Sequence, residues 1–318
     1  MSSSASVCSY GTKKTFCYRY EFEPQDLGEF LSDRYQIHGE RLEEVLSTRI
    51  KINQKQPLVG QSLETGDLLE YDHFRVDESA FIPGELEVLH EDENLLVIAK
   101  PAGVPVSPSG LYYFNALAIH VREVFNLVEL SPLHRLDLET SGVLMFGKHK
   151  LARQLYQKMF AQQKYNKRYL AVTLGNPGLE PVVGEMVGAT NSQIYTKQIV
   201  LDSDTPNSRT EILSVKPWGK FWLVELKPVS GKTNQLRVHL AHRDAAIVGD
   251  KKYYPDEAVY LDWFEHRDFA RLEDNLLIRR QALHCAEISF DDPFSGEYLS
   301  IKDDTPAFYN LIQPLKDL

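Results

Sequence analysis

The sequence has little cysteine and no long apolar run. Its three cysteines, Cys8, Cys17 and Cys285, are scattered over 318 residues and fit neither a disulfide framework nor a zinc-binding spacing. This usage predicts a reducing, cytoplasmic environment. No stretch approaches the 18 consecutive apolar residues of a membrane-spanning helix, so no membrane partner is expected. The glycine patterns of dinucleotide-binding and P-loop proteins are also missing, and we expect no cofactor and no metal.

The charge balance is the next restriction on function. The chain has 35 lysine and arginine residues against 45 acidic ones, a net charge of −10, which taken alone argues against a nucleic-acid partner. Residues 1–17 are rich in serine but lack the apolar run of a secretory signal, so a flexible leader is expected there. With 43% apolar and 25% charged residues, the chain has the composition of a folded globular protein, and its length predicts about two domains.

Two regions of different pattern follow the leader. Residues 18–80 predict a small module, with helical spacing at 41–46, strand-like alternation at 50–55, a turn into a strand at 64–71, and a polar linker at 77–84. Residues 81–318 predict strands at 95–100, 142–147, 169–174, 221–226 and 286–290, and one amphipathic helix at 149–163. Because strands outnumber helices without regular alternation, the predicted fold class is α+β with a large mixed or antiparallel sheet.

The positive charge is concentrated in two stretches of the chain. Residues 148–168 contain seven basic residues and no acidic one, and residues 216–243 contain six basic residues and one acidic one. Much of the acid lies elsewhere, notably at 250–274. Each basic stretch alone fits a solvated surface, but two in an acidic chain favour a phosphate-rich ligand, because only charges within about 8–10 Å act strongly.

A polar loop directly before the strand at 142–147 is the strongest candidate site. A Ser-His-Asp triad is disfavoured, since His134, Asp137 and Ser141 share one short loop. A glycosidase pair is disfavoured because Asp137 and Glu139 point apart if extended, and His134 lacks a metal-binding partner nearby. Two interpretations remain: a carboxylate kept ionised by an arginine for nucleophilic or base chemistry, or a structural aspartate that caps a turn.

The loop resembles a known family signature. His134-Arg135-Leu136-Asp137-x-x-Thr140-Ser141-Gly142 is similar to the H-R-L-D-x-x-T-S-G motif of the RluA-like, large ribosomal subunit type of pseudouridine synthases. Five further stretches resemble motifs of that family and follow in the same order. Residues 94–106 resemble its strand and K-P-A-G turn, residues 167–172 its K-x-Y strand, and residues 230–240 its T-G-R-T-H-Q-I-R-V-H-L segment. Two shorter motifs lie at residues 247–250 and 283–286. The resemblance covers roughly residues 86–306.

This resemblance implies isomerisation of uridine to pseudouridine in ribosomal or transfer RNA, by a monomer without a cofactor. It implies that Asp137 is catalytic, that Arg237 pairs with it, and that Tyr169 stacks on the target base, with a hydroxyl able to polarise a group or relay a proton. Lys232 and Asn234 replace an arginine and a histidine of the family, which concerns substrate contacts. The residues expected to contact substrate or RNA are His134, Arg135, Thr140, Lys148, Lys164, Lys167, Lys232 and Asn234.

The module at 18–80 is similar to the S4 RNA-binding domain. Residues 50–55 stand where that fold has V-x-V-N-G-K, with Gln54 replacing the glycine, and residues 62–71 fit its S-x-x-L-x-x-G-D-x-L ending. The predicted architecture is therefore a small S4-like α/β module followed by a pseudouridine synthase domain.

Two other functions remain open from the sequence. The chain could be a catalytically silent RNA-binding or ribosome-assembly factor on the same scaffold, or a hydrolase built on Asp137 and His134. The first would bind RNA without releasing a labelled C5 hydrogen, and the second would act on small esters or glycosides.

Overall fold

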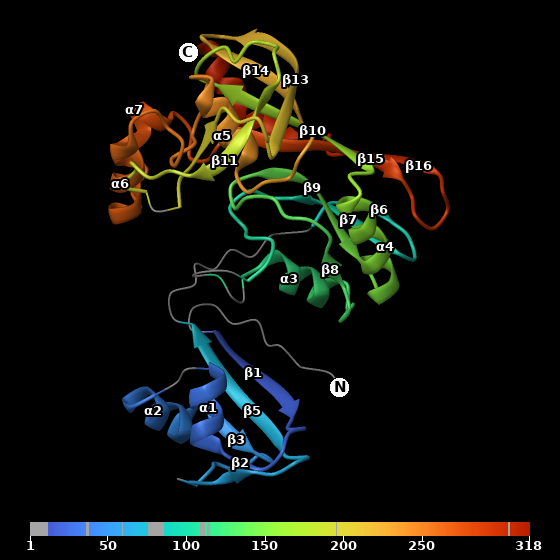
Figure 1. Ribbon diagram of the computed structural model, residues 1–318, viewed down its shortest axis with the longest axis vertical. Helices are drawn as coiled ribbons and strands as arrows, with labels where there is room; N and C mark the ends of the chain where they lie inside the picture. Colours follow the sequence, from blue (N-terminus) through green and yellow to red (C-terminus); the bar gives the residue numbers. More distant parts are fainter. Residues whose placement is uncertain are drawn as a thin grey trace. The chain divides into compact units, whose positions relative to one another are not determined.

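The computed structural model describes residues 12–35, 38–58, 60–75, 86–108, 112, 115–194, 196–304 and 306–318. The chain divides into two compact units, one of residues 1–80 with 110–114, the other of residues 81–109 with 115–318 (Figure 1). Among the described residues, no helix combines the length and apolar character that a bilayer crossing requires.

The first unit packs two helices with a small antiparallel sheet. Its sheet has the strand order β1-β5-β3, and a separate pair of short strands, β2 and β4, lies in the same unit. The core includes Tyr20, Leu31, Val45 and Leu69, all buried. The elements are β1 (Thr12–Arg19), β2 (Gln25–Asp26), α1 (Leu27–Tyr35), α2 (Glu40–Thr48), β3 (Ile50–Ile52), β4 (Ser62–Leu63) and β5 (Leu68–Arg75).

Two expectations for this unit were wrong in part. The flexible leader was expected to reach residue 17, but β1 begins at Thr12 and its backbone pairs with β5 along its whole length. The strand expected at 50–55 ends at Ile52, because Asn53 and Gln54 adopt positive φ angles and the Lys55 N–H donates back to the Ile52 carbonyl at 2.9 Å. The linker expected at 77–84 lies outside the described residues.

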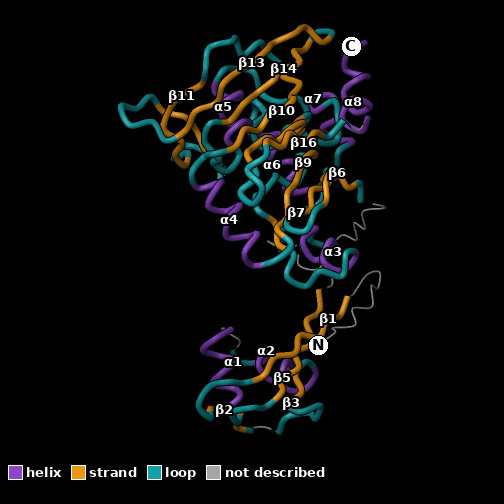
Figure 2. The backbone as a smooth tube through the Cα atoms, turned by 90° about the vertical axis from the view of Figure 1, so that its right-hand side faces the viewer, coloured by secondary structure: helices purple, strands orange, loops and turns teal. Residues whose placement is uncertain are grey.

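The second unit is built on one 11-stranded sheet. The main strand order is β12-β11-β13-β14-β10-β15-β9-β7-β6, and β16 and β8 pair with β15 and β9 (Figures 1 and 2). The pairing of β9 with β15 is parallel and the others are antiparallel, so the predicted mixed sheet is confirmed. The strands are β6 (Val88–Glu91), β7 (Leu95–Lys100), β8 (Ser131–Pro132), β9 (Ser141–Gly147), β10 (Tyr165–Thr173), β11 (Val182–Gly188), β12 (Gln198–Leu201), β13 (Ser208–Trp218), β14 (Phe221–Pro228), β15 (Leu283–Asp291) and β16 (Tyr298–Lys302).

The helices of this unit are short. The longest is α4, which begins after His149, whose side chain accepts a hydrogen bond from the Ala152 N–H and so caps the helix. Its spacing buries Tyr156 and Met159 in the core, as the amphipathic pattern predicts. The helices are α3 (Leu117–Val124), α4 (Lys150–Ala161), α5 (Gln235–His242), α6 (Glu257–His266), α7 (Glu273–Leu276) and α8 (Pro306–Ile312), with 3-10 turns at Ala270–Leu272 and Gln313–Asp317.

Two local features of the sheet position the polar loop and the strand opposite it. Gly142 has a φ of +116°, and a Cβ there would lie 2.2 Å from the Cys285 carbonyl oxygen, so only glycine allows β9 to approach β15 this closely. Between Arg168 and Tyr169 the register of β10 with β15 shifts by one residue. Such an irregularity changes the direction of the side chains beside it.

Candidate active site

A buried lysine side chain forms hydrogen bonds with the loop between β8 and β9. Lys100, at the end of β7, is 1% exposed, and its Nζ donates to the carbonyl oxygens of Pro101, Leu138 and Thr140 at 2.9, 3.1 and 2.8 Å. Burial, followed by the charge of Arg280, lowers the pKa of Lys100 to about 7. Since two of the acceptors belong to the loop, Lys100 fixes the backbone that carries Asp137.

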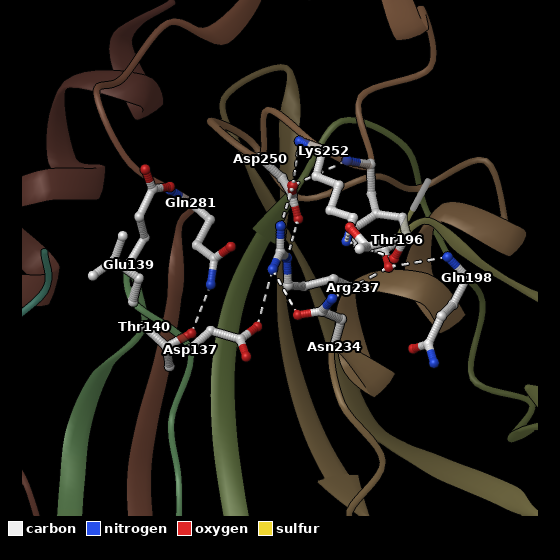
Figure 3. A network of polar contacts seen from close by, with 12 residues as sticks. Asp137, Glu139, Thr140, Thr196, Gln198, Asn234, Arg237, Asp250, Lys252 and Gln281 are labelled. Atoms are coloured by element: carbon white, nitrogen blue, oxygen red, sulfur yellow. Dashed lines mark hydrogen bonds and ion pairs between the residues drawn. The ribbon is translucent and has the colours of Figure 1, made fainter. Parts of the chain in front are cut away.

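Asp137 is paired with an arginine from a distant part of the sequence. Nη1 of Arg237, on α5, donates to Oδ2 of Asp137 at 3.0 Å, and the Asp137 side chain remains 30% exposed (Figure 3). On its other side, Arg237 binds both oxygens of Asp250, which is fully buried, at 2.6 and 2.8 Å. The pKa of Arg237 is raised: burial alone would lower it, but the two carboxylates outweigh burial. Arg237 therefore stays cationic beside Asp137.

Tyr169 reaches the site from β10 and is 8% exposed. Tyr169 pairs with Cys285 on β15, whose thiol is buried. Burial, followed by the charge of Cys285, raises the pKa of Tyr169 well above 10. The hydroxyl therefore stays protonated, and the ring is the part of the side chain that a ligand can stack against.

Lys167 lies two residues before Tyr169, on the same face of β10. Its ammonium is 5.1 Å from the Phe160 ring centroid and 5.4 Å from that of Tyr165. Burial lowers its pKa to about 8. His134 is neutral, because burial and then the charge of Lys167 lower its pKa well below 6.5. Its Nε2 accepts the Met145 N–H at 3.3 Å, so this nitrogen is used by β9.

Five of these residues line one cavity of about 470 Å³: His134, Asp137, Lys167, Tyr169 and Arg237. Of the described residues around it, Asp137 is the only carboxylate, and it lies among the basic side chains of Arg135, Lys167, Lys232 and Arg237. Aromatic and apolar side chains complete the wall, including Phe160, Tyr165, Tyr169, Leu133, Leu136 and Leu283. The cavity thus combines an aromatic and apolar surface, one carboxyl group and several basic side chains, which suits a planar base on an anionic backbone.

Comparison with known proteins identifies the family. The family model described as RNA pseudouridylate synthase matches residues 94–242. The tRNA pseudouridine synthase C of Vibrio parahaemolyticus is 30% identical over 243 residues, which are 70% of this chain and 93% of that protein. The chain belongs to the RNA pseudouridylate synthase family.

Two further relatives agree with this assignment. The ribosomal large subunit pseudouridine synthase D of Zymomonas mobilis is 29% identical over 235 residues, 71% of each chain. The solved structure of human RNA pseudouridylate synthase domain-containing 4 has a TM-score of 0.54 and 25% identity, over 73% of this chain and 93% of that one. The RluA-like resemblance and the fold class are thus confirmed, and the chain is an isomerase of the pseudouridine synthase class.

The structure brings most of the expected contact residues of this synthase together. Arg135, Lys167, Lys232 and Asn234 line the cavity with Asp137 and Arg237. Thr140 also lines it, but its hydroxyl accepts a hydrogen bond from Gln281 at 2.6 Å and it is 2% exposed. Thr140 therefore supports the loop by its hydroxyl as well as by its carbonyl group.

Two expected RNA contacts do not line the cavity. Nζ of Lys148, at the end of β9, donates to Glu91 at 2.8 Å and to the Asp92 carbonyl at 2.6 Å. Lys164 is exposed in the turn between α4 and β10. Arg168, in the same basic stretch, is paired with Glu287 at 3.0 Å. The stretch at 148–168 is therefore less available to RNA than its composition suggests.

Sequence reasoning missed three residues that shape this site: Lys100, Asp250 and Lys251. Lys251, 5% exposed, donates to Glu139 at 2.6 Å, and the second Glu139 oxygen accepts the Gln281 N–H at 3.2 Å. Lys100 and Asp250 fell within recognised motifs without an assigned role. The sequence did contain a signal for Lys100, because it is a charged residue at the end of the apolar strand 95–100 and a buried lysine requires several hydrogen-bond acceptors.

Among the described residues, no cluster of three or more histidine, cysteine or acidic side chains could hold a metal ion.

Proposed function

We propose that this synthase converts specific uridines of ribosomal or transfer RNA to pseudouridine, with Asp137 as the catalytic residue. The relatives support these substrates by their names: the Zymomonas mobilis protein is a ribosomal large subunit synthase, and the Vibrio parahaemolyticus protein is a tRNA synthase. The observation that carries the proposal is the position of Asp137, the one carboxylate among the described residues of a basic, aromatic-lined cavity, 3.0 Å from Arg237.

The reaction breaks the bond between C1′ and N1, rotates the uracil, and joins C5 to C1′. The proton on C5 is lost and N1 gains one, so the product is an isomer and no oxidant or reductant is consumed. Asp137 either attacks the ribose or initiates cleavage of the glycosidic bond, and both steps need the ionised carboxylate. Arg237 donates one N–H to Oδ2 and so orients the carboxylate. A paired base is inaccessible in a helix, so the target is flipped out or taken from a loop.

Substrate binding follows from the other residues around the cavity. The ring of Tyr169 stacks on the uracil, and such stacking contributes about 1–3 kcal/mol per base. Lys167, Arg135 and Lys232 face the anionic backbone from the cavity wall. The first unit serves as an S4-like RNA-binding module, with its two helices and three-stranded sheet.

The test is the Asp137→Asn variant, which keeps the shape of the side chain and removes its charge. Activity is measured as tritium released from RNA that carries 5-tritiated uridine. We expect release to fall by at least about 10³-fold with little change in RNA affinity, because the variant loses the reacting group but no RNA-binding cation. Asp262→Asn is the control, since Asp262 is also bound by an arginine, Arg271, at 2.8 Å, but does not line the cavity.

Each alternative function predicts a different result. Retained turnover in Asp137→Asn would refute the catalytic role of Asp137. A wild-type chain that binds RNA and releases no tritium from any RNA fraction would support the silent RNA-binding factor. Turnover of small esters or glycosides in the absence of RNA would support the hydrolase. Mapping pseudouridines in total RNA with and without the protein then identifies the target.

A further inference from the structure

The guanidinium of Arg237 is almost fully used by protein groups. Two of its N–H groups bind Asp250, one binds Asp137, and one, also on Nη1, binds Oδ1 of Asn234 at 2.9 Å (Figure 3). An arginine has five such donors, so four are accounted for by these contacts. The Tyr253 ring lies against its face, with its centroid 5.0 Å from the guanidinium carbon. The orientation of Arg237 is therefore set before any substrate arrives.

The partners of Arg237 are themselves fixed. Oδ1 of Asp250 accepts hydrogen bonds from the backbone N–H groups of Lys252 and Tyr253 at 3.0 and 3.1 Å. Rotation of the carboxylate would break these two hydrogen bonds. Nδ2 of Asn234 donates to the Tyr253 hydroxyl at 3.4 Å. Arg237 is held from both ends, by Asp250 on one side and by Asn234 on the other.

This arrangement limits what Arg237 offers to Asp137. A free arginine binds a carboxylate with two parallel N–H groups and occupies both oxygens. Here Arg237 forms its bidentate contact with Asp250, and it donates only one N–H, on Oδ2, to Asp137. Oδ1 of Asp137 accepts no side-chain hydrogen bond from another described residue, and the Asp137 side chain, which lines the cavity, is 30% exposed.

We propose that Asp250 and Asn234 are positioning residues that restrict Arg237 to a single contact with Asp137 and so keep one carboxylate oxygen available to the ribose. This inference rests on the proposed role of Asp137. It also changes the interpretation of Asn234, which was expected to contact RNA. Its amide oxygen is bound to Arg237, so we assign it to the orientation of the ion pair.

The first test is Asp250→Asn. The amide cannot accept from both Arg237 donors, so Arg237 can rotate and bind both oxygens of Asp137. We expect kcat for tritium release to fall by about 100-fold, with KM for RNA changed by less than about twofold, because displacing a reacting group by 1 Å has this effect on turnover. Asp262→Asn removes the same charge from an exposed arginine pair and should leave both constants unchanged. A folded Asp250→Asn protein with wild-type kcat would overturn the proposal.

The second test does not depend on a buried residue. Asn234 has a φ of +58°, so Asn234→Gly removes the side chain without straining the backbone. We expect kcat to fall by about tenfold at unchanged KM. Asn126→Gly is the matched control, an exposed asparagine with a φ of +51° outside the cavity. A raised KM with wild-type kcat would show an RNA contact and overturn the assignment of Asn234. Activity in Asp137→Asn would instead refute the proposed function, so the two failures are distinguishable.

Discussion

At the residue scale, Tyr169 illustrates how burial selects one property of a side chain. Burial raises the pKa of its hydroxyl, which therefore stays protonated across the working range of pH. Cys285 is itself buried, and burial raises the pKa of its thiol to about 11, so this pair does not ionise near neutrality. The raised pKa of Tyr169 opposes a proton relay through its hydroxyl, whereas stacking by the ring needs no change of protonation.

Substitutions at Tyr169 separate the ring from the hydroxyl. We expect Tyr169→Phe to retain kcat/KM within about fivefold, because the stacking surface remains. Tyr169→Ala should lower kcat/KM by about 10- to 100-fold, the loss that corresponds to one stacked base. Tritium release from the same RNA measures both variants. A Phe variant as impaired as the Ala variant would show that the hydroxyl takes part in the reaction.

Lys167 predicts a pH dependence of substrate capture. Its pKa is lowered to about 8 by burial, so the ammonium is charged below pH 8 and neutral above it. An attraction to the RNA backbone is therefore present below pH 8 and is lost as the pH rises through that value. We expect kcat/KM to decline across this range in the wild type.

Variants of Lys167 test whether this residue causes the decline of kcat/KM above pH 8. Lys167→Arg keeps its charge at all accessible pH values and should remain active above pH 8. Lys167→Met should show a low value without the step at pH 8, while any step near pH 7 from Lys100 is retained. A step at pH 8 that persists in Lys167→Met would show that another group causes it.

At the scale of elements, the sequence predicted the local elements but missed most side-chain contacts between separate segments. The strands at 95–100 and 142–147 and the helix after His149 follow from unbroken apolar runs and helical spacing. The contact of Asp250 with Arg237 links α5 to the loop 13 residues later, and that of Lys251 with Glu139 joins positions 112 residues apart. No local pattern encodes such pairs, and the family resemblance named the pair of Arg237 with Asp137 but not these two contacts.

The approach of β9 to β15 at Gly142 gives a prediction for stability. Gly142→Ala adds a Cβ at 2.2 Å from the Cys285 carbonyl oxygen, in a backbone conformation with φ of +116°. We expect the free energy of unfolding to fall by about 3 kcal/mol or more, as measured by urea denaturation. Gly178→Ala is the control, since Gly178 also has positive φ but no atom within 4 Å of an added Cβ. It should cost only about 1 kcal/mol. Equal losses would mean that conformation, and not the close approach, requires glycine at 142.

At the scale of the whole molecule, the net charge of −10 and the proposed RNA substrate are compatible because the usable positive charge is confined. Arg135, Lys167 and Lys232 stand at the cavity, while Lys148 and Arg168 are neutralised by Glu91 and Glu287. An acidic molecule with few free cations around its cavity should bind RNA at restricted places and not coat its surface with it. Its affinity should therefore depend on a few identifiable cations and fall with salt.

Salt dependence measures this number of cations directly. For single-stranded RNA, the slope of log K against log salt concentration changes by about 0.7 for each phosphate neutralised. We expect Arg135→Ala and Lys232→Ala each to reduce the magnitude of the slope by about this amount, in fluorescence anisotropy titrations over a potassium chloride series. Lys148→Ala should leave the slope unchanged, because its ammonium is bound to Glu91 in the free protein. A reduced slope in Lys148→Ala would mean that RNA displaces Glu91, and that the basic stretch at 148–168 forms part of the RNA path.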